Sequence, residues 1–456
     1  MTEQNLFGTH GVRGIVNKDL TIEVVFNLSR AIGTFLNGGQ VVTGYDGRIS
    51  SSAFQSVTMG GLASTGCDVC DAGQVPTPMV NFLTRDLKAK GGVIITASHN
   101  PPEYNGVKFI SAGGIDGSEK EAREIERIYS AHSWKNRSWR QMGNVTKNTT
   151  GTRKYFDSIK KCVSVASVQS RHLTVAVDPG NGVSVLTTPP LLSELDCRVL
   201  TINANIDGTF PGRPSEPRPN TLGGLSKFVV ASKADFGVAL DGDGDRAVFV
   251  DEKGKAHWGD KTFALIIEDY LSTRPGATIV TPISSSKLIK DIIDARNGKI
   301  VWTKIGSVSI SQGMLKTGSE LGGEDNGGVL YGPHMITRDG TMTTALIANI
   351  ITKTKQSLST LMAALPAYHI IKDSVPCPNS LKKRVLDLLR ERTRKYNPET
   401  IDGVKIWFKD ESSILMRPSG TEPIFRIFTE AKFAHTAKKL ADQYRAMVAE
   451  EVKSTG

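Results

Sequence analysis

Residues 91–108 read GGVIITASHNPPEYNGVK, and this stretch decides the fold of the N-terminal part of the chain. The apolar run Gly91–Ile95 predicts a buried strand, and the proline pair at 101 and 102 stiffens the loop that follows it. Ser98 therefore lies at the carboxyl end of a strand, where catalytic groups gather in α/β proteins. Taken alone, these residues fit a nucleophilic or phosphate-bearing serine and an ordinary turn equally well.

Similar runs recur along the chain and predict an α/β fold. Apolar, β-branched segments alternate with segments of helical period for most of the length. Strands are expected at Val41–Thr43, Gly92–Ile95, Leu173–Val177, Phe236–Leu240, Ala247–Val250, Thr278–Val280 and Ser413–Met416. Helices are expected at Thr21–Phe35, Ser118–Ser130, Asp260–Leu271, Thr341–Thr352 and Ala434–Val452.

The chain of 456 residues is too long for one hydrophobic core. Several strands are followed by loops of the same kind, which indicates repeated α/β units; these loops are Tyr45–Arg48, Asp178–Gly182 and Asp241–Arg246. Polar stretches at 140–153, 251–259 and 366–378 are candidate linkers. They predict four domains, at 1–150, 151–253, 254–367 and 368–456.

Composition argues against a membrane protein. No apolar run reaches the roughly 18 residues that span a bilayer, and the N-terminus has no signal-peptide pattern. Five scattered cysteines suit a reducing compartment, so a cytoplasmic protein is expected. The net charge of +10 is compatible with nucleic-acid binding, but the basic residues are spread along the chain. A basic surface that attracts small anionic substrates is the favoured interpretation, with no nucleic-acid partner.

Asp241, Asp243 and Asp245 alternate with glycines in a loop between two apolar runs. Clustered carboxylates of this kind suit a hard cation such as Mg²⁺ or Ca²⁺. An EF-hand is excluded because its sixth position requires glycine, and Arg246 stands there. The loop is therefore predicted to bind a divalent cation, with Arg246 beside it to hold a phosphoryl group.

Three further loops carry groups that bind anions or sugars. Arg417–Pro423 combines an arginine, two hydroxyls and a glycine, which are the parts of an anion cradle. Gly322–Gly328 supplies Glu324 and Asn326, whose acceptors and donors suit vicinal sugar hydroxyls, although a glycine-rich turn is the default for this loop alone. Arg13 lies on a glycine-rich loop near the N-terminus.

Together and in this order, the loops resemble the α-D-phosphohexomutase family, which includes phosphoglucomutase, phosphomannomutase and phosphoglucosamine mutase. The segments that carry the resemblance are Phe7–Gly14, Thr96–Lys108, Asp241–Arg246, Gly323–Gly327 and Arg417–Pro423. The resemblance implies four domains around a central cleft, three of them similar mixed α/β domains and the fourth a smaller α+β domain at the C-terminus. It implies an isomerase for small sugar phosphates, and a homo-oligomer is compatible with it.

The resemblance also implies residue roles. Ser98 would carry a phosphoryl group, pass it to a hexose monophosphate to give a bound hexose 1,6-bisphosphate, and receive the other phosphate back. One Mg²⁺ per chain would be held by Ser98, Asp241, Asp243 and Asp245. The other implied roles are charge neutralisation by Arg13 and Arg246, proton transfer by His99 or Lys108, sugar binding by Glu324 and Asn326, and phosphate binding by Arg417, Ser419, Gly420 and Thr421.

Three positions depart from the family pattern. His10 stands where aspartate or serine is usual, Asn326 where serine is usual, and Gly328 where many members have histidine. The resemblance implies that these positions face the sugar, so the departures leave the preferred epimer open. The lead into Phe7 resembles phosphoglucosamine mutases, whereas the serine loop resembles the glucose/mannose enzymes. These mixed resemblances favour a broad phosphoglucomutase/phosphomannomutase specificity, with phosphoglucosamine mutase as the alternative. A sugar phosphatase that uses the same serine is the competing enzyme, and a nucleic-acid-binding protein is the competing class.

Overall fold

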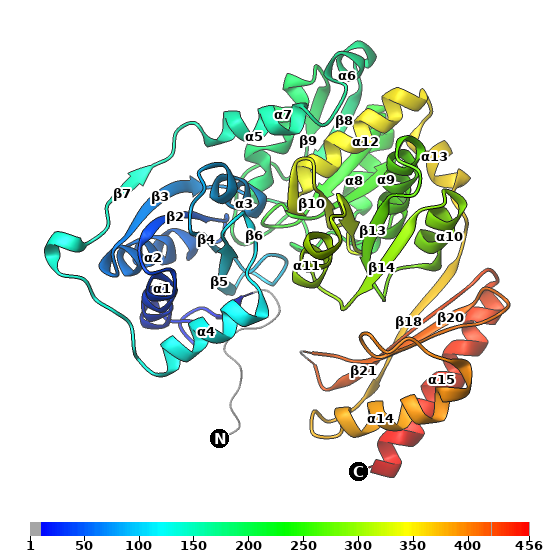
Figure 1. Cartoon of the computed structure of the whole chain (residues 1–456). Helices are drawn as coiled ribbons and strands as arrows, with labels where there is room; N and C mark the ends of the chain where they lie inside the picture. The colour runs from blue at the N-terminus through cyan, green and yellow to red at the C-terminus, as the bar shows by residue number, and fades with distance from the viewer. Residues whose placement is uncertain (1–10, 421, 456) are drawn as a thin grey trace.

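The computed structural model describes residues 11–420 and 422–455, and within them the chain forms four sheets in sequence order (Figure 1). Three of the sheets are mixed and are covered by helices, and the fourth is antiparallel and smaller. The α/β fold class predicted from the sequence is confirmed.

The first sheet has the strand order β1-β5-β4-β2-β3-β7, with β6 paired to β5. Its strands are β1 (Val12–Ile15), β2 (Gly39–Tyr45), β3 (Cys67–Gln74), β4 (Gly91–Ile95), β5 (Tyr104–Ser111), β6 (Ile115–Asp116) and β7 (Val145–Lys147). Its helices are α1 (Ile22–Leu36), α2 (Ser51–Ser64), α3 (Thr77–Asp86) and α4 (Glu119–Ser130). Every residue of β4 is buried, as the apolar run at 91–95 predicts.

The second sheet has the order β12-β11-β10-β8-β9. Its strands are β8 (Thr174–Asp178), β9 (Arg198–Thr201), β10 (Phe236–Leu240), β11 (Ala247–Asp251) and β12 (Ala256–His257). Its helices are α5 (Gly151–Lys160), α6 (Val165–Arg171), α7 (Thr188–Glu194) and α8 (Gly223–Ser232). The antiparallel pair β10 and β11, buried along its length, places the loop 241–246 at one end of the sheet.

The third sheet has the order β14-β13-β15-β16-β17. Its strands are β13 (Thr278–Pro282), β14 (Lys299–Thr303), β15 (Leu321–Gly323), β16 (Val329–Tyr331) and β17 (Met335–Arg338). Its helices are α9 (Gly259–Thr273), α10 (Lys287–Ala295), α11 (Ser307–Thr317), α12 (Gly340–Thr354) and α13 (Leu358–Ala364). The short hairpin of β15 and β16 presents the loop that contains Glu324 and Asn326.

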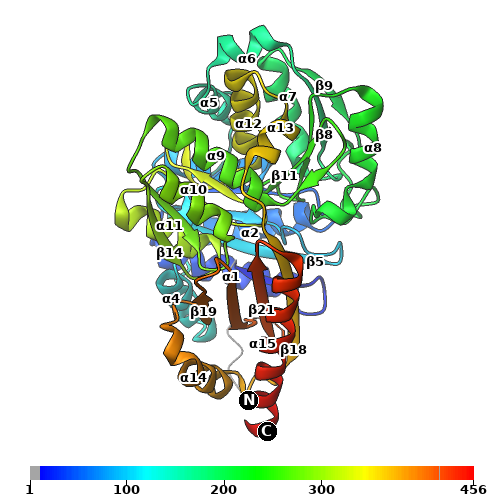
Figure 2. The ribbon, with the colours of Figure 1, turned by 90° about the vertical axis from the view of Figure 1, so that its right-hand side faces the viewer.

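The fourth sheet has the order β18-β21-β20-β19, and all its strand pairs are antiparallel. It consists of β18 (His369–Pro376), β19 (Val404–Trp407), β20 (Ser413–Pro418) and β21 (Ile424–Ala431), with α14 (Lys382–Thr393) and α15 (Ala434–Thr455). Each sheet together with its helices is called a unit, numbered in chain order. Figures 1 and 2 both show the fourth unit below the other three. Its apolar face forms a separate core, whereas one buried cluster runs continuously through the first three units.

The helices and strands expected from the sequence are confirmed within a few residues, and two of the stretches proposed as linkers contain strands that the sequence analysis did not predict. The stretch 140–153 contains β7, which pairs in parallel with β3, and 366–378 contains the eight-residue strand β18. β18 lies at the edge of its sheet and is mostly exposed or half-buried, so its sequence is polar and lacks a buried strand's apolar run. Among the described residues, no helix has the length and apolarity needed to cross a membrane.

Candidate active site

The serine loop, Thr96–Tyr104, holds Ser98 in a constrained conformation. Ser98 has a φ of 51°, in the left-handed region that non-glycine residues rarely adopt. Its backbone N–H donates to Thr96 Oγ1 at 2.8 Å, and the Thr96 hydroxyl donates to Asp46 Oδ2 at 2.7 Å. Strain of this kind persists only where the surrounding contacts enforce it, and it gathers at functional sites.

Arg48 supplies most of that enforcement. Its buried guanidinium pairs with Asp46 at 3.1 Å and donates to the Ser98 carbonyl at 2.8 Å. Further donations reach the carbonyls of Asn100, Pro101 and Tyr104 at distances of 2.7, 2.6 and 2.9 Å. One planar side chain thus fixes the loop through its backbone carbonyls. It does not bind the Ser98 hydroxyl, which lies beside Asp241 of the second unit.

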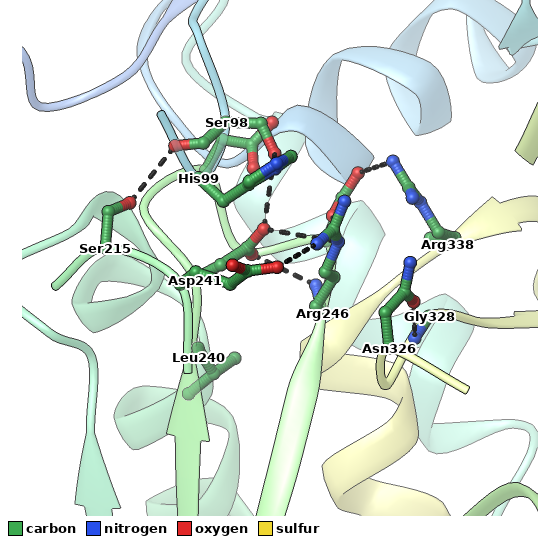
Figure 3. Close-up of polar contacts among 12 residues, drawn as sticks. Ser98, His99, Ser215, Leu240, Asp241, Arg246, Asn326, Gly328 and Arg338 are labelled. Carbon is green, nitrogen blue, oxygen red and sulfur yellow. Dashed lines mark hydrogen bonds and ion pairs between the residues drawn. The ribbon is translucent and has the colours of Figure 1, made fainter. Parts of the chain in front are cut away.

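The metal loop, Asp241–Arg246, brings three buried carboxylates together, and Figure 3 shows one of them, Asp241, beside Ser98. One oxygen from each of Asp241, Asp243 and Asp245 lies within 4.8 Å of the other two. The Ser98 Oγ lies 3.3 Å from Asp241 Oδ2. The predicted serine and the predicted cation ligands, 143 residues apart for Ser98 and Asp241, therefore share one site.

Each of the three carboxylates is oriented through one oxygen. The donors are the Arg246 N–H to Asp241 Oδ1 at 3.1 Å, Thr77 Oγ1 to Asp243 Oδ2 at 2.6 Å, and Arg338 Nη2 to Asp245 Oδ2 at 2.6 Å. The opposite oxygens of two of them, Asp243 Oδ1 and Asp245 Oδ1, are buried without a hydrogen-bond partner. Buried carboxylate oxygens without partners are costly, and a divalent cation would satisfy them. The residues present therefore fit a divalent metal site.

The electrostatics agree with that fit. Burial and the neighbouring aspartates raise the pKa of Asp241 and of Asp243 above the usual range. Burial also acts to raise the pKa of Asp245, but Arg338 and Arg246 outweigh it, so this pKa is lowered. Three carboxylates this close resist full ionisation until a cation offsets their repulsion.

Two of the predicted arginines border the same site. The Arg246 Nε lies 3.8 Å from oxygens of both Asp241 and Asp245, and its Nη1 lies 3.3 Å from Glu216. Arg13, on β1, donates to Asn100 of the serine loop at 2.7 Å. Burial lowers the pKa of Arg13 to about 10, which leaves it cationic at neutral pH. The Nε atoms of both side chains are buried without a hydrogen-bond partner, so each can bind an incoming anion.

His99 and Lys108, the two predicted proton-transfer groups, lie in different surroundings. His99 Nδ1 is 3.3 Å from the Ser98 Oγ, and burial together with nearby arginines lowers its pKa to about 2, so the ring is neutral. Lys108 forms a buried ion pair of 2.8 Å with Asp116, which also accepts a hydrogen bond from Ser307 at 2.6 Å. Burial acts to raise the pKa of Asp116, but Lys108 outweighs it, and the pKa lies well below the usual range.

The sugar loop, Gly322–Gly328, joins the site through an arginine that the sequence analysis did not single out. Arg338 Nη1 donates to Glu324 Oε1 at 2.7 Å while its other nitrogen holds Asp245. Asn326 turns back on the loop, and its Oδ1 accepts the Gly328 N–H at 3.0 Å (Figure 3). Glu324 is therefore connected to the metal loop, and Asn326 shapes the sugar loop itself.

The phosphate loop, Arg417–Pro423, lies in the fourth unit. Arg417 is the next-to-last residue of β20 and pairs with Asp402 at 3.3 Å, and Asp402 also accepts the N–H of Ile305 from the third unit at 3.1 Å. Burial lowers the pKa of Arg417. Ser419 is buried and Gly420 is exposed; Thr421 and His10 lie outside the described residues.

Five residues that organise the site were not predicted: Asp46, Arg48, Thr77, Asp116 and Arg338. Asp46 and Arg48 gave a signal, because the loop Tyr45–Arg48 follows a strand just as the metal loop does. The same device recurs in the second unit, where Arg213 pairs with Asp178 at 2.8 Å and donates to the Leu240 carbonyl. Thr77, Asp116 and Arg338 each also make a contact between units, to Asp243, Ser307 and Asp245 respectively.

A serine hydroxyl, a cation site and buried arginines, all placed in advance, are what phosphoryl transfer requires, since its catalysis is mainly positioning and charge neutralisation. The class that the fold and site define is thus a phosphotransferase acting on small anionic substrates.

Comparison with known proteins narrows that class. The family models of phosphoglucomutase/phosphomannomutase match in order: α/β/α domain I at 4–136, domain II at 153–254, domain III at 258–368 and the C-terminal domain at 375–447. The chain belongs to the phosphoglucomutase/phosphomannomutase family, and the resemblance found in the sequence is confirmed. It is a phosphohexomutase, an isomerase that works by phosphoryl transfer.

Relatives and solved structures agree. A phosphoglucomutase/phosphomannomutase from Thermococcus kodakarensis is 40% identical over 454 residues, covering 98% of this chain and 99% of the relative. A phosphoglucosamine/phosphogalactosamine mutase from Sulfurisphaera tokodaii is 37% identical, covering 97% and 99%. The crystal structure of a family protein from Burkholderia thailandensis superimposes with a TM-score of 0.89 at 26% identity, covering 100% and 99%.

Proposed function

We propose that this phosphohexomutase interconverts hexose 6-phosphates and hexose 1-phosphates through a phosphorylated Ser98, with glucose and mannose phosphates as substrates. The observation that carries the proposal is the Ser98 Oγ, 3.3 Å from Asp241 Oδ2, on a loop that Arg48 clamps. No other serine of the described residues combines a strained backbone with a place beside the three carboxylates.

Asp241, Asp243, Asp245 and the Ser98 oxygen would hold one divalent cation per chain, proposed to be Mg²⁺, whose chemistry is to withdraw charge from the transferring phosphoryl oxygens. Arg13 and Arg246 would neutralise the charge on the same oxygens, and the Nε atoms of both are buried without a hydrogen-bond partner. Because Thr77, Arg338 and the Arg246 N–H fix the three carboxylates in advance, little reorganisation is needed during transfer.

In the first half-reaction, the bond between phosphorus and the Ser98 oxygen breaks, and a bond forms from phosphorus to the free hydroxyl of the bound monophosphate. The Ser98 oxygen takes up a proton as its bond to phosphorus breaks, and the attacking hydroxyl releases one; His99 and Lys108 remain the alternatives for the group that gives the first proton and accepts the second. His99 is closer to Ser98, whereas Lys108 has a buried carboxylate partner in Asp116. The product of this step is a bound hexose 1,6-bisphosphate, which we also propose as the activator that phosphorylates Ser98.

The second half-reaction needs the bisphosphate to present its other phosphate to Ser98. Glu324 and Asn326 would bind the ring hydroxyls, and Arg417, Ser419, Gly420 and Thr421 would bind the phosphate that does not react. Arg417 supports this role because its Nε is buried without a hydrogen-bond partner while Asp402 fixes its Nη2. The phosphate then returns to Ser98 and the isomerised monophosphate leaves.

The names of the relatives support two substrate assignments. One relative is a phosphoglucomutase/phosphomannomutase, and others are phosphoglucosamine mutases or probable ones. We propose broad specificity for glucose and mannose phosphates, with glucosamine 6-phosphate as the alternative substrate. Coupled assays with glucose 1-phosphate, mannose 1-phosphate and glucosamine 6-phosphate, each with Mg²⁺ and a bisphosphate, test this. Turnover of none of the three, or release of inorganic phosphate without an isomer, contradicts the proposal.

We keep 1–150, 151–253, 254–367 and 368–456 as proposed domain bounds. The buried, unpaired thiols at 67, 70, 197 and 377 support the proposed cytoplasmic location. Small sugar phosphates are the proposed partners, and a homo-oligomer stays a proposal to be tested by scattering.

A further inference from the structure

Within the described residues, Arg338 is the one cation that bonds to both a proposed metal ligand, Asp245, and a proposed sugar ligand, Glu324. It ends β17, and its side chain is 2% exposed. Nη2 lies 2.6 Å from Asp245 Oδ2, and Nη1 lies 2.7 Å from Glu324 Oε1. The planar guanidinium suits this bridge, because its nitrogens point in fixed directions toward two separate carboxylates.

Gly328 provides the space that this side chain occupies. A Cβ added at Gly328 would lie 2.3 Å from Arg338 Cδ and 3.0 Å from Arg338 Cγ. The φ of Gly328 is outside the left-handed region, unlike that of Gly327 at 92°, so the backbone conformation does not require glycine there. Space for Arg338 is therefore the physical reason for a glycine at position 328.

The sugar loop holds Gly328 against Arg338 by hydrogen bonds of its own. The Glu324 N–H donates to the Gly328 carbonyl at 3.0 Å, and Asn326 Oδ1 accepts the Gly328 N–H at 3.0 Å. Both residues at which this chain departs from the family pattern in this loop, Asn326 and Gly328, thus serve the same packing arrangement. The arginine, the glycine and the asparagine form one unit.

We propose that Arg338 is a positioning residue that sets Asp245 for the cation and Glu324 for the sugar, and that Gly328 and Asn326 are present to accommodate it. The proposal rests on the function proposed above. Arg338 engages Asp245 Oδ2 and so leaves Oδ1 directed at the cation. It engages Glu324 Oε1 and so leaves Oε2 available for the sugar. Binding of the cation at Asp245 therefore changes the position of Glu324, and binding of the sugar at Glu324 changes that of Asp245, through the Arg338 side chain.

A purely structural role is the competing explanation, because Arg338 also neutralises two buried carboxylates. The two explanations differ in what Arg338→Lys does. A lysine keeps the charge but has a single ammonium group, which cannot hold both carboxylates in the geometry of the guanidinium. Gly328→Ala keeps the arginine and its charge but displaces the side chain. Neither variant leaves a buried carboxylate without a nearby cation.

The experiment measures Mg²⁺ affinity by calorimetry on unphosphorylated protein, together with KM, kcat and thermal unfolding. Arg338→Lys is expected to weaken Mg²⁺ binding about tenfold and to raise KM by a similar factor, as loss of a group that orients metal ligands does. Gly328→Ala is expected to reproduce both changes. The double variant should be no worse than Arg338→Lys alone, because both substitutions remove the same contact. Arg296→Lys, in the exposed pair with Glu268, is the matched control.

Unchanged Mg²⁺ affinity and unchanged KM in Arg338→Lys and Gly328→Ala overturn the proposal, whatever happens to thermal stability. Additive losses in the double variant also overturn it, because they separate Gly328 from Arg338. If Arg338→Lys does not fold, Gly328→Ala carries the test alone. Mg²⁺ binding does not depend on sugar turnover, so failure of this inference is distinguishable from failure of the proposed mutase activity.

Discussion

The serine loop and the phosphate loop each present a hydroxyl, yet they are built differently. The serine loop is fixed by Arg48, a buried fork that reaches four of its carbonyls, and Ser98 itself is held in the left-handed region. In the phosphate loop, Gly420 is exposed, and Arg417 is held by one carboxylate, Asp402, at 3.3 Å.

The cores beneath the two loops differ in the same way. β4 and β10 lie in the first three units, which share a continuous apolar cluster, whereas β20 belongs to the separate cluster of the fourth unit. The groups proposed to act on the transferring phosphoryl are thus placed before substrate arrives, and the groups proposed to bind the other phosphate lie on a more independent unit. Substitutions in the first region should lower kcat, and those in the second should raise KM.

The largest effect is expected for Ser98→Ala. This change removes the atom that carries the phosphoryl group, so kcat/KM should fall by at least about a thousandfold. Mg²⁺ binding should weaken, because the Ser98 oxygen is one of the four proposed ligands. Thermal stability should be nearly unchanged, because Ser98 holds its loop through backbone groups. The exposed Ser170→Ala serves as the control for a lost hydroxyl. Retained turnover in Ser98→Ala would remove the phosphoserine from the mechanism.

Asp243→Asn should have the second largest effect on activity. It keeps an acceptor for Thr77 but removes one of the charges that bind the cation, so kcat is expected to fall about a hundredfold and Mg²⁺ affinity to weaken. Without metal, Asp243→Asn should unfold at a higher temperature than the parent protein without metal. The reason is that two buried carboxylates repel each other less than three do. A metal-free variant that is less stable, with Mg²⁺ affinity preserved, contradicts a metal site at these aspartates.

Arg48→Lys tests the serine loop, which Arg48 holds rigidly. The lysine retains the charge beside Asp46 but cannot reach the four loop carbonyls, so the Ser98 hydroxyl loses its fixed position. We expect kcat to fall about tenfold to a hundredfold, in the range that a misplaced reacting group costs. The free energy of unfolding should fall by about 2 kcal/mol, as for lost hydrogen bonds to a charged donor. An unchanged kcat with reduced stability would show that the clamp serves folding alone.

Arg417→Lys tests the phosphate loop of the fourth unit and should have the smallest effect on activity. A lysine still binds phosphate but loses the fork that Asp402 orients, so KM is expected to rise about tenfold while kcat changes less than about threefold. Steady-state kinetics with the preferred sugar phosphate measure both. A kcat that falls as far as in Arg48→Lys would erase the distinction between the two loops.

Contiguous features of the site could be predicted from sequence, and features between units could not. Asp241, Asp243 and Asp245 stand within five residues, and Ser98 directly follows a recognisable strand, so their chemistry can be inferred locally. The hydrogen bond from Thr77 to Asp243 joins residues 166 apart, and that from Arg338 to Asp245 joins residues 93 apart. Such contacts depend on how the units pack, which no local pattern specifies. β18 was missed for a related reason, since an edge strand gains its order from its partner β21.

Phosphoryl transfer onto Ser98 tests the central claim most directly. The unphosphorylated protein would be incubated with Mg²⁺ and glucose 1,6-bisphosphate carrying labelled phosphate, then digested, and the labelled peptide identified by mass spectrometry. The account predicts one labelled phosphoryl group per chain, on Ser98, with glucose monophosphate released and no label in Ser98→Ala. Label on another residue, or inorganic phosphate in place of a phosphorylated protein, would contradict it.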